Sequence, residues 1–322
     1  ENFRASIILD ISQAVSAYTA LRQDHLSTVS ALGAGEGALR QVGQGFVDTA
    51  QKMAGGILTA VGAAGEFERK LDFFGAVSNA TQAEYDAISK KALQLGADTI
   101  YSSGEIADSF VELAKSGVSA QDVLDGIGEA VANLGAATDI PLAEAATSLT
   151  TILNTFKISA EDSVEVVDRL AGAANSSSID IGDLITTMTY AGASAATAGV
   201  EFADVNTAIA LLGERGIKGS KAGTGLRQMF DKLIAPTNKG KEALQGLGIV
   251  LEDGSNQLLD MNGNLKPIPQ LLDILNGSLS GLTSAEKMDV LGNIFPITSL
   301  PTILNLLDGG SEAMARLNRE IT

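Results

Sequence analysis

The segment from Gly216 to Arg227 is the strongest candidate in this chain for anion chemistry. It reads Gly-Ile-Lys-Gly-Ser-Lys-Ala-Gly-Thr-Gly-Leu-Arg, so it holds four glycines and three cations, and it leads into a predicted helix at 222–235. Backbone N–H groups at a helix N-terminus attract phosphate and other anions. The P-loop pattern is absent, however, and a dinucleotide fingerprint should follow a strand, whereas the preceding residues read as helix. We therefore favour a tight loop between helices, with Ser220 or Thr224 near the helix cap.

This loop remains the position in the chain that we predict to take part in an interaction. The predicted interaction residues are Gly216, Lys218, Gly219, Lys221, Gly223, Thr224 and Arg227.

Other candidate sites fail on residue type or spacing. Asp260–Asn264 resembles the start of a calcium loop, but Leu265 and Leu271 stand where that loop needs Gly and Glu. The only histidine, His25, has no second ligand or triad partner, and the absence of cysteine excludes disulfides and thiolate metal sites. Carboxylates are plentiful, but no pair stands out as a two-carboxylate hydrolase would require. The sequence thus predicts no enzyme, no metal and no cofactor.

Two series of branched aliphatic residues recur about every 40 residues and predict how the chain is organised. The first series is Val118, Ile158 and Val200, each with Asp four residues later. The second series is Ile100, Ile140, Ile179 and Ile217. Two interleaved series with one period predict helical hairpins, one hairpin per repeat, that bury their apolar faces on their neighbours.

Helix caps refine this reading. Three hydroxyl residues are followed three positions later by Glu, which is the spacing of a capping box: Thr81, Ser102 and Thr283. Ser119 and Ser159 read as further N-caps, and Pro141 reads as a first-turn proline. The predicted helices lie near 81–95, 103–116, 119–134, 141–156, 159–174, 181–193, 201–214, 222–235, 268–279, 284–293 and 300–307.

A β-prone run at 249–251 and the turn dipeptide Asn262-Gly263 interrupt the helical pattern. The predicted fold is therefore mainly α, with repeated helical hairpins of period about 40 residues and a small β-hairpin element near residues 249–266. Three regions follow: long, glycine-interrupted N-terminal helices at 1–75, the helical-hairpin core at 76–247, and the β-element with short helices at 248–322. The chain begins at Glu1 rather than Met, so we expect it to be a piece of a longer protein.

Charge is unevenly distributed along the chain. The net charge is −17, which argues against nucleic acid as the main partner. Residues 81–215 hold 20 acidic and 6 basic residues, whereas residues 216–250 hold 6 basic and 2 acidic ones. The acidic block is interpreted as a solubilising surface, with an electrostatic guide for a basic partner as the alternative. Aromatics make up only 4% and Trp is absent, so aliphatic side chains and Ala must build the core.

Several short stretches, in this order and spacing, carry a resemblance to a known family. They are Phe67-Glu68 with Phe74–Val77, Gly96–Ser102, Glu105–Ala107 with Leu113–Gly117, Asp168–Ala171 with Ala173–Ser176, and Gly216–Thr224 followed by Leu226-Arg227. Together they resemble the core region of phage tail tape measure proteins, of the lactococcal siphophage type, over roughly residues 66–280. The first 65 and the last 40 residues are less clearly covered.

This resemblance implies a structural virion protein that lies in the lumen of the tail tube, helps to set tail length during assembly, and leaves the tube at genome ejection. It implies the tail tube protein, tail assembly chaperones and tail tip proteins as partners, three or six copies per tail, synthesis in the bacterial host cytoplasm, no direct sequence-specific nucleic-acid binding, and contact with the host membrane at ejection. It assigns no catalytic residues.

Two alternatives stay open from the residues alone. A helical-repeat scaffold or adaptor that binds one partner protein would use the same repeats and acidic surface. A membrane-active segment at 39–65, which is apolar and rich in glycine, would pack closely in lipid, although it is short for a membrane span.

Overall fold

The structure, a computed structural model, describes residues 62–138 and 140–322. Residues 70–322 form one compact unit of the chain. The long helix predicted at 3–31, the residue His25 and most of the 39–65 segment lie outside the described residues. The predicted region boundaries near 75 and 247 stay predictions.

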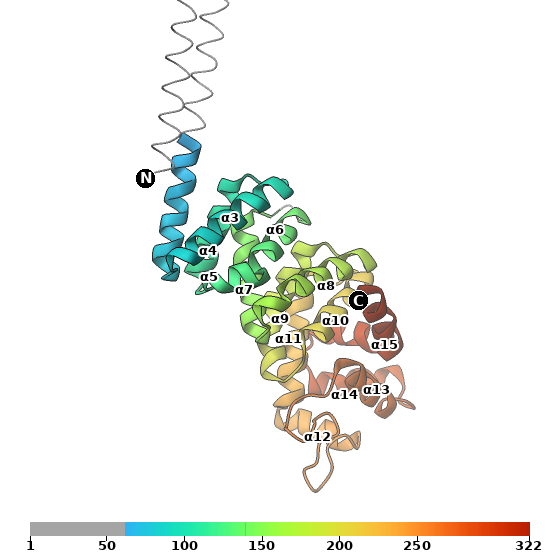
Figure 1. Cartoon of the computed structure of the whole chain (residues 1–322). Coiled ribbons are helices and arrows are strands. Elements are labelled where there is room, and N and C mark those ends of the chain that lie inside the picture. Colours follow the sequence, from blue (N-terminus) through green and yellow to red (C-terminus); the bar gives the residue numbers. More distant parts are fainter. Residues whose placement is uncertain (1–61, 139) are drawn as a thin grey trace, which may run out of the picture. The chain divides into compact units, whose positions relative to one another are not determined.

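The described chain is helical, as predicted. Residues 62–78 form a helix. The elements that follow it in chain order, of which Figure 1 labels the α-helices, are α3 (Gln82–Asp98), α4 (Ser103–Lys115), α5 (Ala120–Asp122), the π-helical turn η1 (Val123–Ile127), α6 (Gly128–Ala136), α7 (Leu142–Phe156), the 3-10 turn η2 (Ala160–Asp162), α8 (Ser163–Ser176), α9 (Ile181–Thr197), α10 (Phe202–Glu214), α11 (Gly219–Ile234), α12 (Asn238–Gly246), α13 (Ile268–Ser278), α14 (Ser284–Ile294) and α15 (Leu300–Ile321).

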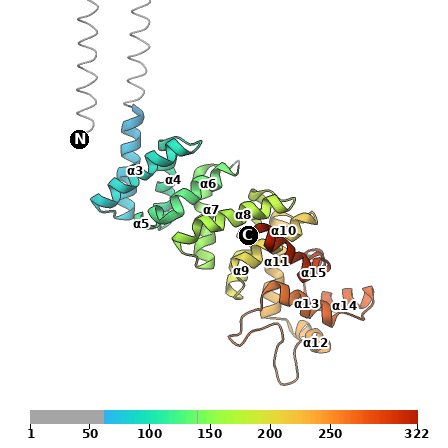
Figure 2. The same ribbon diagram turned by 45° about the vertical axis from the view of Figure 1, so that its right-hand side comes forward.

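These helices form the repeated hairpins that the sequence predicts. The first helices of successive repeats pack on one another, in the order α4, α7, α9 and α11. The second helices do the same, in the order α6, α8 and α10. The helix α15 then returns to pack on α8, α10, α11 and α13 (Figure 2). The result is a two-layered array whose end at α10 and α11 is covered by the last helix of the chain.

The first aliphatic series marks one kind of helix end. After α4, Gly117 adopts a φ of +85°, and the N–H of Val118 bonds the carbonyl of Leu113 at 3.0 Å. This is the Schellman arrangement, in which a left-handed residue is followed by an apolar one that folds back on the helix. A second bond runs from the N–H of Gly117 itself to the carbonyl of Ala114 at 3.0 Å, and the same pair of bonds recurs at four further helix ends: Lys157-Ile158, Gly199-Val200, Gly216-Ile217 and Gly248-Ile249. The repeat seen in the sequence is thus a repeat of helix termination.

Lys157 is the only non-glycine residue at these five left-handed positions, with a φ of +55°. A side chain there costs about 1 kcal/mol relative to glycine. We therefore expect Lys157→Gly to raise the free energy of unfolding by about 1 kcal/mol, as measured by urea denaturation. The matched change is Gly117→Ala, where an added Cβ meets open space and only the backbone cost applies. An unchanged or lower stability of Lys157→Gly would show that Lys157 makes compensating contacts.

The predicted caps are largely confirmed. Capping boxes are present at Thr81, Ser102 and Thr283, and also at Ser119 with Asp122. Ser159 precedes the 3-10 turn η2, where its hydroxyl donates to the Asp162 carboxylate at 2.8 Å. The prediction for Pro141 is off by one position: it is the N-cap residue of α7 itself.

The predicted β-hairpin element at 249–266 is wrong. The described residues there form only two isolated antiparallel bridges, Val250 with Asn256 and Leu259 with Leu265. Asn262-Gly263 does make a tight turn, but the Asp260 carboxylate accepts the backbone N–H groups of Asn262 and Asn264, both at 2.8 Å. The N–H of Leu265 bonds the carbonyl of Ala198 at 2.8 Å, at the end of α9. Turn side chains and a neighbouring helix therefore take the hydrogen bonds that a ladder would need.

Candidate functional site

The predicted Gly216–Arg227 loop is mostly helix. The helix α11 begins at Gly219, three residues earlier than predicted, so only Gly216 and Lys218 of the predicted interaction residues precede it. Gly216 is the left-handed residue of a Schellman end, with a φ of +74°. The loop interpretation fails because glycine inside a helix costs only about 1 kcal/mol, which packing against neighbouring helices offsets.

The glycines of α11 let two neighbouring helices come close. A Cβ on Gly223 would lie 2.5 Å from Cβ of Tyr190 and 2.7 Å from the carbonyl oxygen of Thr187, both on α9. A Cβ on Gly225 would lie 2.5 Å from Cβ of Thr302 on α15. Gly223 thus serves helix packing and does not cradle an anion.

The N-terminus of α11 already faces a carboxylate. A Cβ on Gly219 would lie 2.9 Å from Oδ1 of Asp183 on α9, and the hydroxyl of Thr187 donates to the Gly219 carbonyl at 3.1 Å. Burial raises the pKa of Asp183, the nearby Asp180 raises it further, and Lys218 lowers it. The Lys218 ammonium group in turn donates to the carbonyl of Ser178. A phosphate at this helix end would meet the Asp183 charge, so the arrangement does not favour an anion site.

The remaining predicted residues lie on the surface. Lys221 and Arg227 are exposed, and Thr224 is half-buried between them. Within residues 62–138 and 140–322, neither the Lys221 nor the Arg227 side chain forms a hydrogen bond or ion pair. The structure therefore separates the predicted set into packing residues inside and an exposed cationic stripe outside.

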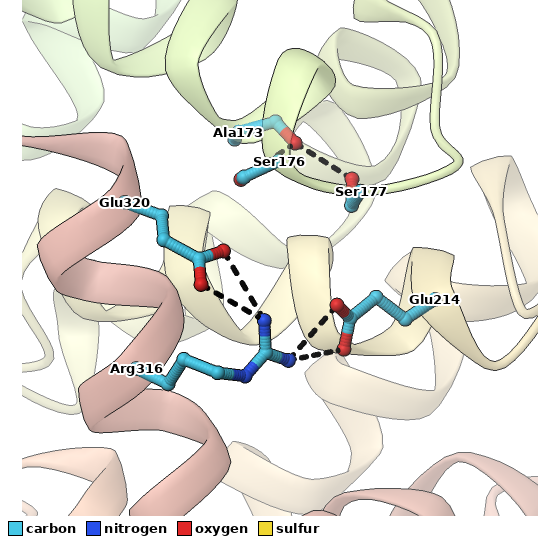
Figure 3. Close-up of polar contacts among 6 residues, drawn as sticks. All are labelled: Ala173, Ser176, Ser177, Glu214, Arg316 and Glu320. Carbon is cyan, nitrogen blue, oxygen red and sulfur yellow. Dashed lines mark hydrogen bonds and ion pairs between the residues drawn. The ribbon is translucent and has the colours of Figure 1, made fainter.

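Ion pairs that were not predicted hold α15 to α10. In Figure 3 the Arg316 guanidinium lies between two carboxylates, donating to Glu214 on α10 at 2.8 and 2.9 Å and to Glu320 on its own helix at 3.1 and 3.2 Å. Glu214 and Glu320 raise the pKa of Arg316. A second pair joins Arg215 to Asp308. These partners lie about 100 residues apart in the sequence, so local sequence patterns could not predict the ion pairs.

A surface groove of about 860 Å³ lies where two hairpins meet. The ends of α7 and α9 and the starts of α8 and α10 line it. Its apolar side chains include Phe156 and Phe202, whose ring centroids lie 5.7 Å apart in an edge-to-face arrangement. Sequence reasoning missed this groove because it is formed by residues of two separate repeats.

Beside the groove, Asp204 of α10 holds the start of α13, since its Oδ2 accepts the N–H of Ile268 at 3.0 Å. Burial raises its pKa above the ordinary 3.8, the Ile268 bond lowers it, and the charge of Glu201 raises it. Because the folded pKa exceeds the unfolded one, this carboxyl stabilises the fold below about pH 4, and that contribution is lost as pH rises through the folded pKa.

We expect Asp204→Asn, which keeps an oxygen for Ile268 but cannot ionise, to remove this pH dependence. The free energy of unfolding of Asp204→Asn, relative to that of wild type, should rise as the pH increases from about 4 through the folded pKa of Asp204. Urea denaturation at a series of pH values measures this difference. A difference that stays constant with pH would contradict the prediction.

Comparison with known proteins places the chain in a family. The family model for phage-related minor tail proteins matches residues 89–295, which run from within α3 to the end of α14 and include α11. The chain belongs to this family. Together with the two relatives described next, this match confirms the resemblance to tape measure proteins that the sequence motifs predict.

Two relatives of this minor tail protein carry the name tape measure protein. The chain is 27% identical over 256 residues to a tape measure protein of Pneumococcus phage Dp-1, and the match covers 80% of this chain and 22% of the relative. It is 28% identical over 292 residues to a probable tape measure protein of Escherichia phage P2, which covers 85% of this chain and 35% of the relative. The chain thus spans between about a fifth and a third of these relatives. No solved structure matches it.

Proposed function

We propose that this chain is a module of a phage tail tape measure protein that acts by packing and assembly rather than by catalysis. The observation that carries the proposal is the match of the minor tail protein family from within α3 to the end of α14, with relatives named tape measure proteins. In this role the chain lies in the lumen of the tail tube, contributes to tail assembly and length, and leaves with the genome at ejection.

The fold supports a folded module of the tape rather than the ruler itself. A helix rises about 1.5 Å per residue, so a continuous helix of residues 70–322 would span roughly 380 Å. The chain instead folds those residues back into stacked hairpins. Their longest uninterrupted helices, α3 and α9, have 17 residues each, and α15 is broken at Gly310. Length would then be measured by other parts of the longer protein, while this module holds an assembly contact.

The proposed partners follow from the role. They are the tail tube protein, the tail assembly chaperones and the tail tip proteins, together with further copies of the chain, three or six per tail. The acidic block at 81–215 supports a protein partner rather than nucleic acid, because it would repel phosphate.

The adaptor alternative has one observation in its favour, the groove between two hairpins, because repeat arrays bind partners on such surfaces. The membrane alternative rests on residues 39–65, most of which lie outside the described residues. No helix in the described part of the chain is long and apolar enough to cross a membrane. Contact with the host membrane at ejection stays a proposal for the whole protein.

Electron microscopy of particles from a phage with residues 70–322 deleted in frame tests the proposal. We expect missing tails or tails of uncontrolled length, because an assembly contact is lost. A uniform shortening by roughly 380 Å would instead show that the segment is part of the ruler. Normal tails of normal length would exclude a tape measure role for this segment and favour the adaptor.

A further inference from the structure

The exposed side of α11 carries two cations with two apolar side chains beside them. Lys221 and Arg227 are exposed without partners among the described residues, and Thr224 lies between them. Tyr190 is 45% exposed and Ile297 is 80% exposed. We name these five residues the α11 patch.

Two contacts place the apolar residues on either side of the cationic stripe. Gly223 brings Tyr190 of α9 against one side of α11. On the other side, the hydroxyl of Thr298 donates to the side-chain oxygen of Gln228 at 3.2 Å, which holds the loop with Ile297 beside the helix. Figures 1 and 2 show α9 and α11 running side by side. Residues 221, 224 and 228 share a helix face over about 10 Å.

The composition of the α11 patch favours a protein partner with an acidic rim and an apolar recess. Exposed aromatic and aliphatic side chains next to arginine are typical of interface centres. The surrounding segment 216–250 has 6 basic and 2 acidic residues in a chain of net charge −17. Such a local reversal of charge would steer an acidic surface to this face.

The chain itself holds a recess of this kind in the groove at the ends of α7 and α9. Its apolar lining includes Val166, Val200 and Phe202, all of which are largely buried. The charged lining residues are Asp162, Glu165, Glu201, Lys157 and Arg169, which leaves an excess of one acid. Arg169 is already paired with Glu165 at 2.9 Å, so the other charged lining residues are Glu201, Asp162 and Lys157.

We propose that the α11 patch of one copy docks into the α7–α9 groove of a second copy. In this interface, Ile297 enters the apolar recess, and Lys221 and Arg227 face the acidic side of the rim. The patch and the groove are different surfaces, so the association is head-to-tail and closes into a ring only at a fixed copy number. The proposal rests on the proposed function, in which several copies share one tail.

Two variants of the purified 322-residue chain separate the two surfaces. The patch variant carries Ile297→Asp with Arg227→Glu, and the groove variant carries Ala193→Arg with Glu201→Lys, where Ala193 is an exposed lining residue. Sedimentation velocity over a concentration series measures association. We expect wild type to self-associate, and we expect the dissociation constant of each variant alone to be at least about tenfold higher.

Mixing the two variants is the decisive step. Each keeps the surface that the other has lost, so an equimolar mixture should form a heterodimer and stop there. The control Lys239→Glu with Lys241→Glu makes a larger change of charge at exposed positions on α12 and should associate like wild type. Circular dichroism checks that each variant remains folded.

Three results would overturn the proposal: a monomeric wild type at all concentrations, a patch variant that associates like wild type, or variants that fail alone and also fail when mixed. The last result would assign the α11 patch to another acidic partner. None of these bears on tail length in the deletion phage, so failure of the interface and failure of the proposed function are told apart.

Discussion

Gly225→Ala is expected to lower the free energy of unfolding by about 2 kcal/mol, although alanine is the better helix former. The added Cβ would lie 2.5 Å from Cβ and 2.8 Å from Cγ2 of Thr302, which real Cβ atoms do not approach so closely. Overpacking in a core costs about 1–3 kcal/mol, and the gain in helix propensity, at most about 1 kcal/mol, does not cover it. The helices α11 and α15 would have to separate.

The matched control is Gly292→Ala in α14. Gly292 is exposed, and a Cβ there meets nothing within 4 Å. The same substitution should therefore raise stability by up to about 1 kcal/mol. Urea denaturation of both variants measures whether each substitution raises or lowers the free energy of unfolding. Equal effects would show that α15 shifts easily against α11.

A double-mutant cycle ties the effect to the contact. Thr302→Gly removes the Cβ that the new methyl group would meet, so it should restore part of the stability that Gly225→Ala loses. Contacting residues typically couple by about 0.5–3 kcal/mol. Additive losses would mean that the cost arises elsewhere in α11.

Local signals in the sequence account for most helix starts. A hydroxyl residue followed by Glu three positions later defines the start from its own atoms, so the boundaries at Thr81, Ser102 and Thr283 could be predicted without knowing the neighbours. The hairpin period could be predicted for the same reason, because the Schellman ends depend on one left-handed residue and the aliphatic residue after it. These features lie within about six residues of chain.

The errors have different physical origins. The start of α11 at Gly219 depends on contacts with α9 and α15, which lie far along the chain. The β-prone run at 249–251 instead bonds to nearby turn residues, Leu244, Ser255 and Gln257. Glycine in α11 is tolerated because Thr187 and Thr302 fill the space that its side chain would take. The helix α12 was not predicted, because it buries only Gly240 and Leu244 and so has little apolar periodicity.

The candidate site shows the same division. The sequence identifies the α11 residues that stand out by type, but it cannot tell Lys218, which bonds Ser178, from Lys221, which bonds nothing described. Tyr190 and Ile297 carry no motif and join the α11 patch only through packing. Site residues brought together by several repeats therefore require the structure.

The stacked hairpins should not all lose stability together when one of them is weakened. Phe110 of α4 is fully buried and packs against Phe74, with ring centroids 6.4 Å apart. Truncating a buried Phe to Ala costs about 3–5 kcal/mol. In an array, each repeat contacts mainly its neighbours, so we expect the loss from Phe110→Ala to be confined largely to α3–α7.

Hydrogen exchange resolved by residue distinguishes local from global loss. Phe110→Ala should speed exchange in α3 to α7 while α11, α13 and α15 stay protected. The matched variant is Phe230→Ala in α11, where Phe230 is equally buried. Because α15 packs on α8, α10, α11 and α13, this second variant should lower protection across all of those helices at once. If both variants lowered protection evenly throughout the described helices, the array would be one cooperative unit. The helices packed on α15 would then not unfold separately from α3–α7.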